Sequence, residues 1–355
     1  MMIDLPIRRG YEGPNRVSTC QFLRMRPLWL NYEGTEKLTD FQVKCVLTPT
    51  DIPFEKLRTD KQDLLFVDNN NEPIPYWIEK ADSTEIIVWL KFSEIIPGKE
   101  VFWLYYGNGN FSGVSNVSAI FIRMIDGLVG AWHLDEGSGN VAYDSSGQGN
   151  DGTIYGATWI DGKFGKALSF DGSDDYVDFG NDPTLTDVSD ITIILWFSFT
   201  DIPTYDAQLI GVMDVWSNPS YYNIWIDNGS GYFTFRYKTS DDVWEVKSGA
   251  AFNDGQYHHI AAVRAGSEIK IFVDGVLKNS VSGVSGSVST SESLKLCGKY
   301  ESYVKGYADE VFVFNKALSD EEISDLYNNY GYTTTNYPGK VLVKKYTEPE
   351  PFVSL

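Results

Sequence analysis

Short apolar runs separated by turn residues recur along the chain and predict β-strands. In the first third of the sequence the clearest runs are residues 41–47, 64–67, 86–92 and 101–106. Residues 86–90 are apolar at every position, which is typical of a strand that is buried on both faces. The spacing of these runs predicts a β-sandwich.

A hairpin and a helix are predicted toward the other end of the chain. Residues 269–273 form a strand-like run that leads into Asp274 and Gly275, a pair suited to a type I′ hairpin turn. Ser319 and Glu322 fit a capping box, and the apolar residues that follow them share one helical face. We therefore expect an all-β protein of two antiparallel β-sandwiches, with one short helix near the C-terminus.

The length of 355 residues favours two packed domains. Small and polar residues at 111–126 predict a linker, which places one domain at 26–110 and a second at 127–330. Residues 1–25 are interpreted as an N-terminal extension or docking arm. The tail, 331–355, contains a strand-like run, and we expect it to return to the first domain, so that the second domain is a large insertion.

The formal net charge of -20 argues against nucleic acid as a partner, because an acidic surface repels phosphate and no Lys/Arg run offsets it. No apolar stretch has the length of a signal peptide or of a membrane span, so membrane insertion is not expected. An aromatic share of 15% suits half-buried strands.

Three cysteines, Cys20, Cys45 and Cys297, are too few and too scattered for a disulfide framework or a paired-ligand zinc site. A bridge between Cys20 and Cys45 is one interpretation. Small buried thiols are the favoured alternative.

Several blocks in the N-terminal part resemble a known module. They are residues 38–43, 57–60, 75–79 and 105–108. They are similar to an uncharacterised β-rich domain of unknown function that often precedes laminin-G-like domains in prokaryotic surface proteins. This resemblance implies an architecture and no chemistry.

A longer series of blocks resembles the laminin-G-like domains of the concanavalin A-like lectin/glucanase superfamily. In order, the blocks are residues 127–136, 143–147, 150–152, 162–172, 191–199, 254–261, 272–275, 309–311 and 317–323. The resemblance implies that the second sandwich is a concanavalin A-like jelly roll. It also implies a lectin-like role in carbohydrate binding or cell adhesion.

One acidic residue is predicted to be buried. In residues 307–314 Asp309 shares an apolar strand face, and a buried charge needs a partner or a metal. A glycine-rich loop beside the first strand of this domain offers further oxygen ligands, namely Asp135, Asp144, Asn150 and Asp151. Oxygen ligands of this kind suit calcium, so one hypothesis is a structural calcium site. The alternative is that Asp309 lies in solvent and the loop residues form Asx turns.

A sugar site is predicted around a presumed loop in the second domain. Pyranose C–H groups pack on aromatic faces, while amides and carboxylates hydrogen-bond the hydroxyl groups. The residues that offer both chemistries are Trp216, Tyr221, Tyr222, Asn223, Trp225 and Trp244. The alternative is that these aromatic residues close the sandwich core and its edges.

Catalysis is not predicted, although the superfamily includes glycoside hydrolases. Laminarinase-like members carry a Glu-x-Asp-x-x-Glu strand, and this chain contains no such segment. No histidine lies within a triad-like or metal-ligand motif. A glycoside hydrolase that uses an unrelated carboxylate pair remains an alternative hypothesis.

These observations predict a non-enzymatic surface recognition or adhesion protein that binds glycans. The expected partners are a glycan or a cell-surface receptor. A virion or tail-fibre component, for receptor binding or decoration, is the specific form of this hypothesis, located outside the cell or on the virion surface. A purely structural building block of a virion or surface layer, which would self-assemble, is the alternative.

Overall fold

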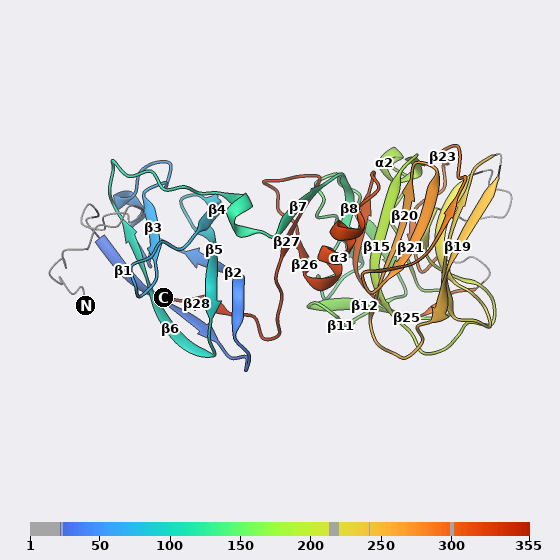
Figure 1. Cartoon of the computed structure of the whole chain (residues 1–355), viewed down its shortest axis with the longest axis horizontal. Coiled ribbons are helices and arrows are strands. Elements are labelled where there is room, and N and C mark those ends of the chain that lie inside the picture. The colour runs from blue at the N-terminus through green and yellow to red at the C-terminus, as the bar shows by residue number, and fades with distance from the viewer. Residues whose placement is uncertain (1–21, 23, 213–219, 241, 299–301) are drawn as a thin grey trace. The chain divides into compact units, whose positions relative to one another are not determined.

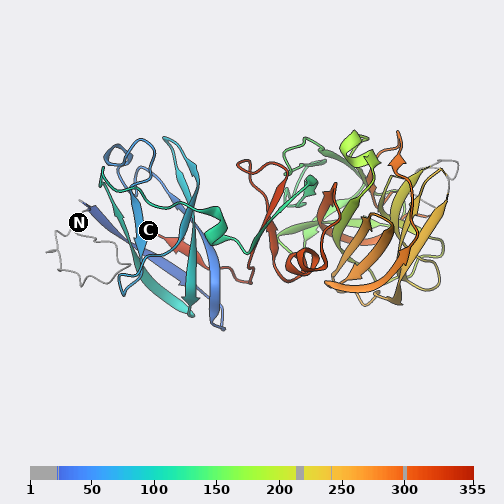
Figure 2. The same cartoon turned by 45° about the horizontal axis from the view of Figure 1, so that its top comes forward.

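The computed structural model describes residues 22, 24–212, 220–240, 242–298 and 302–355. The chain divides into two compact units, one of Met1–Arg123 with Lys344–Leu355 and one of Met124–Val343. The second unit is therefore inserted between two parts of the first. In both views the red C-terminal strand lies among the blue strands of the first unit (Figure 1, Figure 2).

The described part of the first unit contains two antiparallel sheets. One has the order β28 (Phe352–Ser354), β1 (Arg24–Tyr32), β6 (Gly98–Tyr106) and β3 (Leu64–Val67). The other has the order β2 (Leu38–Leu47), β5 (Ile86–Ile95) and β4 (Tyr76–Ala81), and a short 3-10 turn, η2 (Phe54–Lys56), follows β2. One apolar cluster that includes Leu30, Val43 and Leu90 fills this unit. Strand β28 pairs with residues Trp29–Asn31 of β1.

The segment predicted as a linker, 111–126, contains regular structure. Helix α1 (Val117–Ile120) begins at Asn116, whose side-chain oxygen accepts a hydrogen bond from the Ser118 N–H at 3.0 Å. Ile120 is fully buried, and its carbonyl accepts from the Gln42 side chain at 2.8 Å. The boundary between the two units, after Arg123, falls within this segment, and its small polar residues include a helix cap as well as loop positions.

The strand that follows this helix belongs to a small sheet. Strand β7 (Arg123–Asp126) lies at one edge of a three-stranded sheet with β27 (Lys340–Lys344) and β26 (Tyr330–Tyr332). The predicted tail therefore includes strands of both units.

In its described residues, the second unit is built from two eight-stranded antiparallel sheets. The sheet that we call the front sheet has the order β19 (Val243–Ala251), β18 (Tyr232–Lys238), β17 (Tyr221–Ile226), β16 (Ala207–Gly211), β24 (Lys295–Leu296), β13 (Tyr176–Asp178), β10 (Gly152–Tyr155) and β9 (Val141–Ala142). The back sheet has the order β11 (Thr158–Asp161), β12 (Lys166–Asp171), β25 (Lys305–Phe314), β15 (Ile191–Ser198), β20 (His258–Ala265), β21 (Glu268–Val273) and β22 (Val276–Ser282), and β8 (Leu128–Trp132) also pairs with β25.

Smaller elements join the two sheets. They are β14 (Asp187–Val188), which pairs with β23 (Val288–Ser289), and the helices α2 (Pro183–Thr186) and α3 (Asp320–Asn328). Among the described helices α3 is the longest, so the expectation of one short helix near the C-terminus is confirmed. No helix in the described residues has both the length and the apolar character needed to cross a bilayer.

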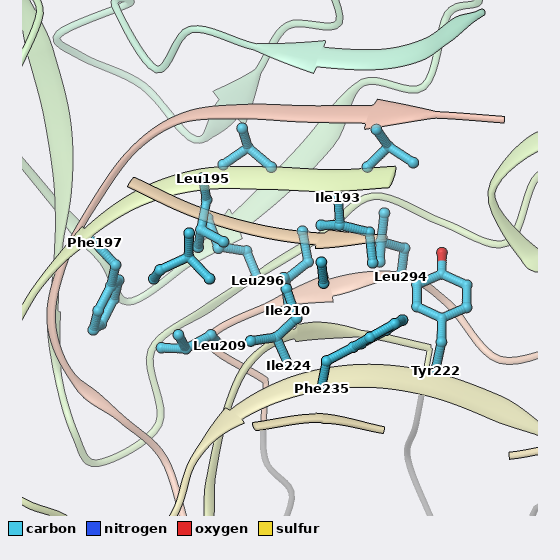
Figure 3. Packing of buried hydrophobic residues seen from close by; sticks show 14 of the residues in the cluster. Ile193, Leu195, Phe197, Leu209, Ile210, Tyr222, Ile224, Phe235, Leu294 and Leu296 are labelled. Carbon is cyan, nitrogen blue, oxygen red and sulfur yellow. The ribbon is translucent and has the colours of Figure 1, made fainter. Parts of the chain in front are cut away.

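Alternating side chains of the two sheets form the core between them. Figure 3 shows Ile193, Leu195 and Phe197 of β15 pointing toward side chains of the front sheet such as Ile210 and Ile224. The residues between them on β15 point away from this core, and Ile194 joins a second cluster beneath α3. Strand β15 is buried at all eight positions because one face lies in the sandwich and the other beneath that cover.

The predicted hairpin and capping box are both confirmed. Asp274 and Gly275 adopt φ values of 54° and 71°, as a type I′ turn requires, and join β21 to β22. At the start of α3 the Ser319 hydroxyl accepts from the Glu322 N–H at 3.1 Å, and the Glu322 carboxylate accepts from the Ser319 N–H at 2.8 Å.

Asp309 of β25 holds the loop between β11 and β12 against the back sheet. Its side chain is fully buried, and its Oδ2 atom accepts from the N–H groups of Lys163 and Phe164 at 2.8 and 2.9 Å. Oδ1 has no hydrogen-bond partner among the described residues. Burial, with the neighbouring Glu310 carboxyl group, raises the pKa of Asp309 to about 9. The folded protein therefore keeps this proton at neutral pH.

Replacing Leu195 by Ala tests the packing of the sandwich. We expect Leu195→Ala to lower the free energy of unfolding by about 2–5 kcal/mol, because it removes buried methyl groups and leaves a cavity. Urea unfolding of the full chain measures this change. The control Val276→Ala alters a side chain that is 56% exposed and should stay within about 0.5 kcal/mol of wild type. Equal effects of the two changes would contradict the described core.

The raised pKa of Asp309 predicts that the stability of the folded protein depends on pH. Its pKa rises from an ordinary value of 3.8 to about 9 on folding, so the folded state binds more protons than the unfolded state between these values. Its stabilising contribution is complete below the lower value and is lost as the pH rises through the higher one. Asp309→Asn, which stays neutral, should flatten the loss of unfolding free energy between about pH 5 and about pH 8.5 in urea titrations. Exposed Asp201→Asn should leave the wild-type slope, and an unchanged slope in Asp309→Asn would refute this account.

Candidate functional site

A row of mostly polar residues crosses the outer face of the front sheet. Consecutive cross-strand pairs connect seven neighbouring strands, through Glu245, Arg236, Asn223, Gly211, Lys295, Asp178 and Thr153. Because side chains alternate along a strand, the apolar neighbours of these residues point into the core. Val246, Phe235 and Ile224 are examples, and all three belong to the core cluster. We call this set of seven residues the polar row.

A second set of side chains lies beside the polar row, centred on Trp225. In register, Trp225 pairs with Gln208 on one side and with Thr234 on the other. The Arg236 guanidinium lies 4.4 Å from the centroid of the Trp225 ring. Arg236 also donates to Glu245 Oε1 from Nε at 2.6 Å and to the Tyr221 hydroxyl at 3.1 Å. These contacts hold the charged and aromatic side chains at this end of the polar row in defined positions.

The centre of this outer face is polar and yet buried. Gln208, Asn223 and Thr234 are fully buried. Gln208 Oε1 and Thr234 Oγ1 have no hydrogen-bond partner among the residues that the structure describes. A buried polar atom without a partner costs about 1–3 kcal/mol. Groups of this kind are normally completed by ordered water or a ligand.

Two aromatic side chains lie at the other end of the outer face, Tyr155, which is exposed, and Tyr176, which is half-buried. Tyr155 of β10 and Tyr176 of β13 are cross-strand partners, and their rings stack with centroids 4.5 Å apart at 15°. Tyr155 is 46% exposed. The Lys295 ammonium group lies 6.0 Å from the centroid of the Tyr176 ring. We call Tyr155 and Tyr176 the tyrosine platform.

The turn after Tyr155 keeps the platform in place. Gly156 has φ +74°, and a Cβ atom there would lie 2.0 Å from Asp175 Oδ1, so only glycine fits. The other oxygen of Asp175 accepts from the Asp171 N–H at 2.8 Å. Burial raises the pKa of Asp175.

The described part of the predicted sugar loop is mostly a strand. Trp216 lies outside the described residues. Tyr221, Tyr222, Asn223 and Trp225 belong to β17, which is buried at all six positions. At residues 221–225 a strand replaces the predicted loop, because residues 221–226 are rich in aromatic and β-branched side chains, which favour strands.

The strand separates these residues between two faces. Tyr222 faces the core and donates from its hydroxyl to the Leu185 carbonyl at 2.5 Å. Asn223 and Trp225 lie on the outer face in alternate positions, while Tyr221, at the start of the strand, also belongs to the core cluster. Trp244 is partly buried against the core cluster, as the alternative interpretation expected.

The structure does not gather the five predicted calcium ligands into one site. Asp144 organises a turn, since its two carboxylate oxygens accept from the N–H groups of Ala131, Ser146 and Asn150 and from the Ser146 hydroxyl. Asp151 accepts from the Asp144 N–H at 2.7 Å. These loop residues therefore make turns, as the alternative interpretation expected.

Asp309 and Asp135 lie elsewhere, around the loop between β11 and β12. Asp135 Oδ1 accepts from the Lys166 N–H at 2.7 Å, and Asp309 accepts from two N–H groups of the same loop. Oxygens that accept from backbone N–H groups in two separate places do not fit a single calcium ion. Calcium binding stays a prediction. The one group of three acids close enough to share an ion in the described residues is Asp171, Asp174 and Asp175, with ligand atoms within 4.8 Å of one another.

Sequence reasoning missed most of the outer face. Its remaining members come from strands that are far apart in the chain, and only the sheet register brings them together. They are Thr153, Tyr155, Tyr176, Asp178, Gln208, Gly211, Thr234, Arg236, Glu245 and Lys295. No local motif marks them, because each stands as a single outward position in an ordinary strand.

Comparison with solved structures finds similar folds at low sequence identity. The binding domain of Paraclostridial Mosquitocidal Protein 1 is 14% identical with a TM-score of 0.49, over 57% of this chain and 52% of that chain. The receptor-binding domain of the botulinum neurotoxin C/D mosaic serotype is 12% identical with a TM-score of 0.47, over 57% and 52%. This chain spans about half the length of these two toxin domains.

Domain 4 of AbnA, an extracellular arabinanase of Geobacillus stearothermophilus, was solved with arabinotriose and is also similar. It is 21% identical with a TM-score of 0.49, over 57% of this chain and 98% of that chain. No curated protein matches the sequence.

Two family models match the chain. Residues 171–324 match the concanavalin A-like lectin/glucanases superfamily, in its laminin-G-like model. Residues 60–135 match a domain of unknown function, DUF2341. The chain is thus a tandem of an N-terminal domain of that uncharacterised family and a C-terminal concanavalin A-like domain of the lectin/glucanase superfamily.

Proposed function

We propose that the protein recognises glycans on the outer face of the front sheet and does not cleave them. The observation that carries this proposal is the combination, on one face, of the polar row and the tyrosine platform. Sugar rings pack on aromatic groups, and their hydroxyl groups hydrogen-bond to amide, carboxylate and hydroxyl side chains. The match to a lectin/glucanase superfamily supports the same class of ligand.

The back sheet offers no comparable face in its described part. Its outer side is apolar where Ile194, Ala261 and Phe312 cluster, and Ile323 and Leu326 of α3 cover them. The front sheet carries charged and amide side chains at the corresponding outward positions. Because α3 covers the centre of the outward face of the back sheet, the front sheet is favoured as the recognition surface.

The acids of the polar row are poorly placed for glycoside hydrolysis. Glycosidases use two carboxyl groups about 5–10 Å apart. Glu245 of β19 and Asp178 of β13 are separated by five strand spacings, or about 24 Å. Glu245 is paired with Arg236, and Asp178 accepts from the Gly180 N–H at 2.9 Å. This separation supports binding without turnover.

An extracellular or virion-surface setting is part of the proposal. Single sugar sites bind weakly, and presentation of many copies on a surface raises the avidity. Residues 1–25, predicted to be a docking arm, lie outside the described residues except for Phe22, Arg24 and Met25. Self-assembly and a virion role therefore stay predictions from the sequence.

Glycan arrays, calorimetry and a sugar-release assay test the proposed function. We expect the full chain to bind a subset of immobilised glycans, and to release no reducing ends from the corresponding polysaccharides. Silence on the arrays and in calorimetry would refute recognition. Sugar release that disappears when a carboxylate is substituted would refute the absence of turnover and favour a glycoside hydrolase.

A further inference from the structure

We propose that the tyrosine platform is a subsite for an uncharged sugar ring, which packs against the exposed ring of Tyr155. This inference rests on the proposed function and makes it specific in place and in ligand class. It assigns the recognition to the β10 and β13 end of the front sheet. It also predicts a preference for neutral glycans over acidic ones.

The stacking order leaves one ring face for a ligand. Tyr176 lies between Tyr155 and the ammonium group of Lys295, in the strand order β10, β13, β24. Thr153 of β10 pairs with Val141 of β9. Two residues further along this antiparallel register, Tyr155 lies opposite Gly139. Gly139 has no side chain, and a Cβ atom added there would meet nothing within 4 Å. No side chain at position 139 therefore covers the face of Tyr155 turned toward Gly139. Tyr155 is 46% exposed, and the Trp159 indole, which donates to the Gly139 carbonyl at 3.0 Å, borders the same space.

Hydrogen-bonding groups lie beside the platform on the same face. Thr153 and Asp178 are cross-strand partners, two residues away from Tyr155 and Tyr176 respectively. Such neighbours are separated by about 5 Å across the strands and about 7 Å along them. Thr153 is exposed and Asp178 is half-buried. A sugar that packs on Tyr155 thus has a hydroxyl and a carboxylate within reach of its own hydroxyl groups.

The local charge discriminates between ligand classes. Asp171, Asp174 and Asp175 lie within the five residues before Tyr176, with carboxylate oxygens within 4.8 Å of one another, and Asp178 follows two residues after it. Lys295 is the one cation of the polar row at this end. Four acids outnumber two bases, Lys295 and the Lys305 that pairs with Asp171 across the strands, and they repel a uronate, a sialate or a sulfated sugar at this range, whereas a neutral sugar is unaffected. The whole chain, at -20, adds to this repulsion.

Arrays of matched glycans test the ligand class. The probes are immobilised neutral hexose and pentose oligosaccharides and the corresponding oligosaccharides that carry uronate or sialate groups. We expect binding to members of the neutral set, with an affinity that changes little from low salt to about 0.5 M salt. Preferential binding of the acidic set, or an affinity that falls steeply with salt, would overturn the assignment to uncharged sugars.

Substitutions at Tyr155 test the position, by calorimetry with the neutral oligosaccharide that binds best on the array. Tyr155→Ala should weaken binding by about tenfold, and Tyr155→Phe by no more than about threefold, because the ring makes the contact. The matched control is Tyr307→Ala, which removes a tyrosine that is 44% exposed on β25 of the back sheet. It should leave the affinity unchanged.

A second variant keeps the test decisive if Tyr155→Ala does not fold. Thr153→Tyr places a ring at an exposed strand position that favours aromatic residues, and it should weaken binding by about tenfold because it fills the space beside the platform. Wild-type affinity in folded Tyr155→Ala or in Thr153→Tyr, with neutral glycans still bound, would overturn the subsite and leave the proposed function standing. Failure of the wild-type chain to bind any glycan would overturn both.

Discussion

Burial of alternate side chains between the front and back sheets determines the rest of the second unit. Once Ile224, Phe235 and Leu296 are committed to the core, their strand neighbours must point outward, because the side-chain period of a strand is two residues. Asn223, Arg236 and Lys295 occupy those outward positions and meet in the polar row. The proposed recognition surface is therefore specified by the packing on the other side of the same strands.

The two sheets differ in what their outward side chains contact. The back sheet turns its second face toward α3, so Ile194 and Phe312 are apolar outward residues and β15 is buried throughout. The exception is Asp309, an acid on that covered face, which keeps its proton and holds a loop by two backbone hydrogen bonds. The front sheet keeps polar groups outward, and two of them, Gln208 and Thr234, are buried without a partner in the described residues.

The sequence allowed the fold to be predicted further than the site. Local chemistry was sufficient for the turn at Asp274 and Gly275 and for the start of α3, because φ preferences and capping act within a few residues. The family resemblance supplied the sandwich. The platform, by contrast, depends on the pairing of Tyr155 with Tyr176, and a cross-strand register is not written in either segment alone. Asp309 was correctly expected to be buried, but its backbone partners, Lys163 and Phe164, lie about 145 residues away in sequence.

The first unit cannot be completed during synthesis until the second unit has been made. Strand β28 follows the whole inserted unit and pairs with Trp29–Asn31 of β1, near the start of the first unit. During synthesis the edge of β1 at these residues thus stays unpaired until the entire concanavalin A-like domain has emerged. An open edge of this kind is prone to associate with other strands, so the first unit is exposed to misassembly for as long as its last strand is missing.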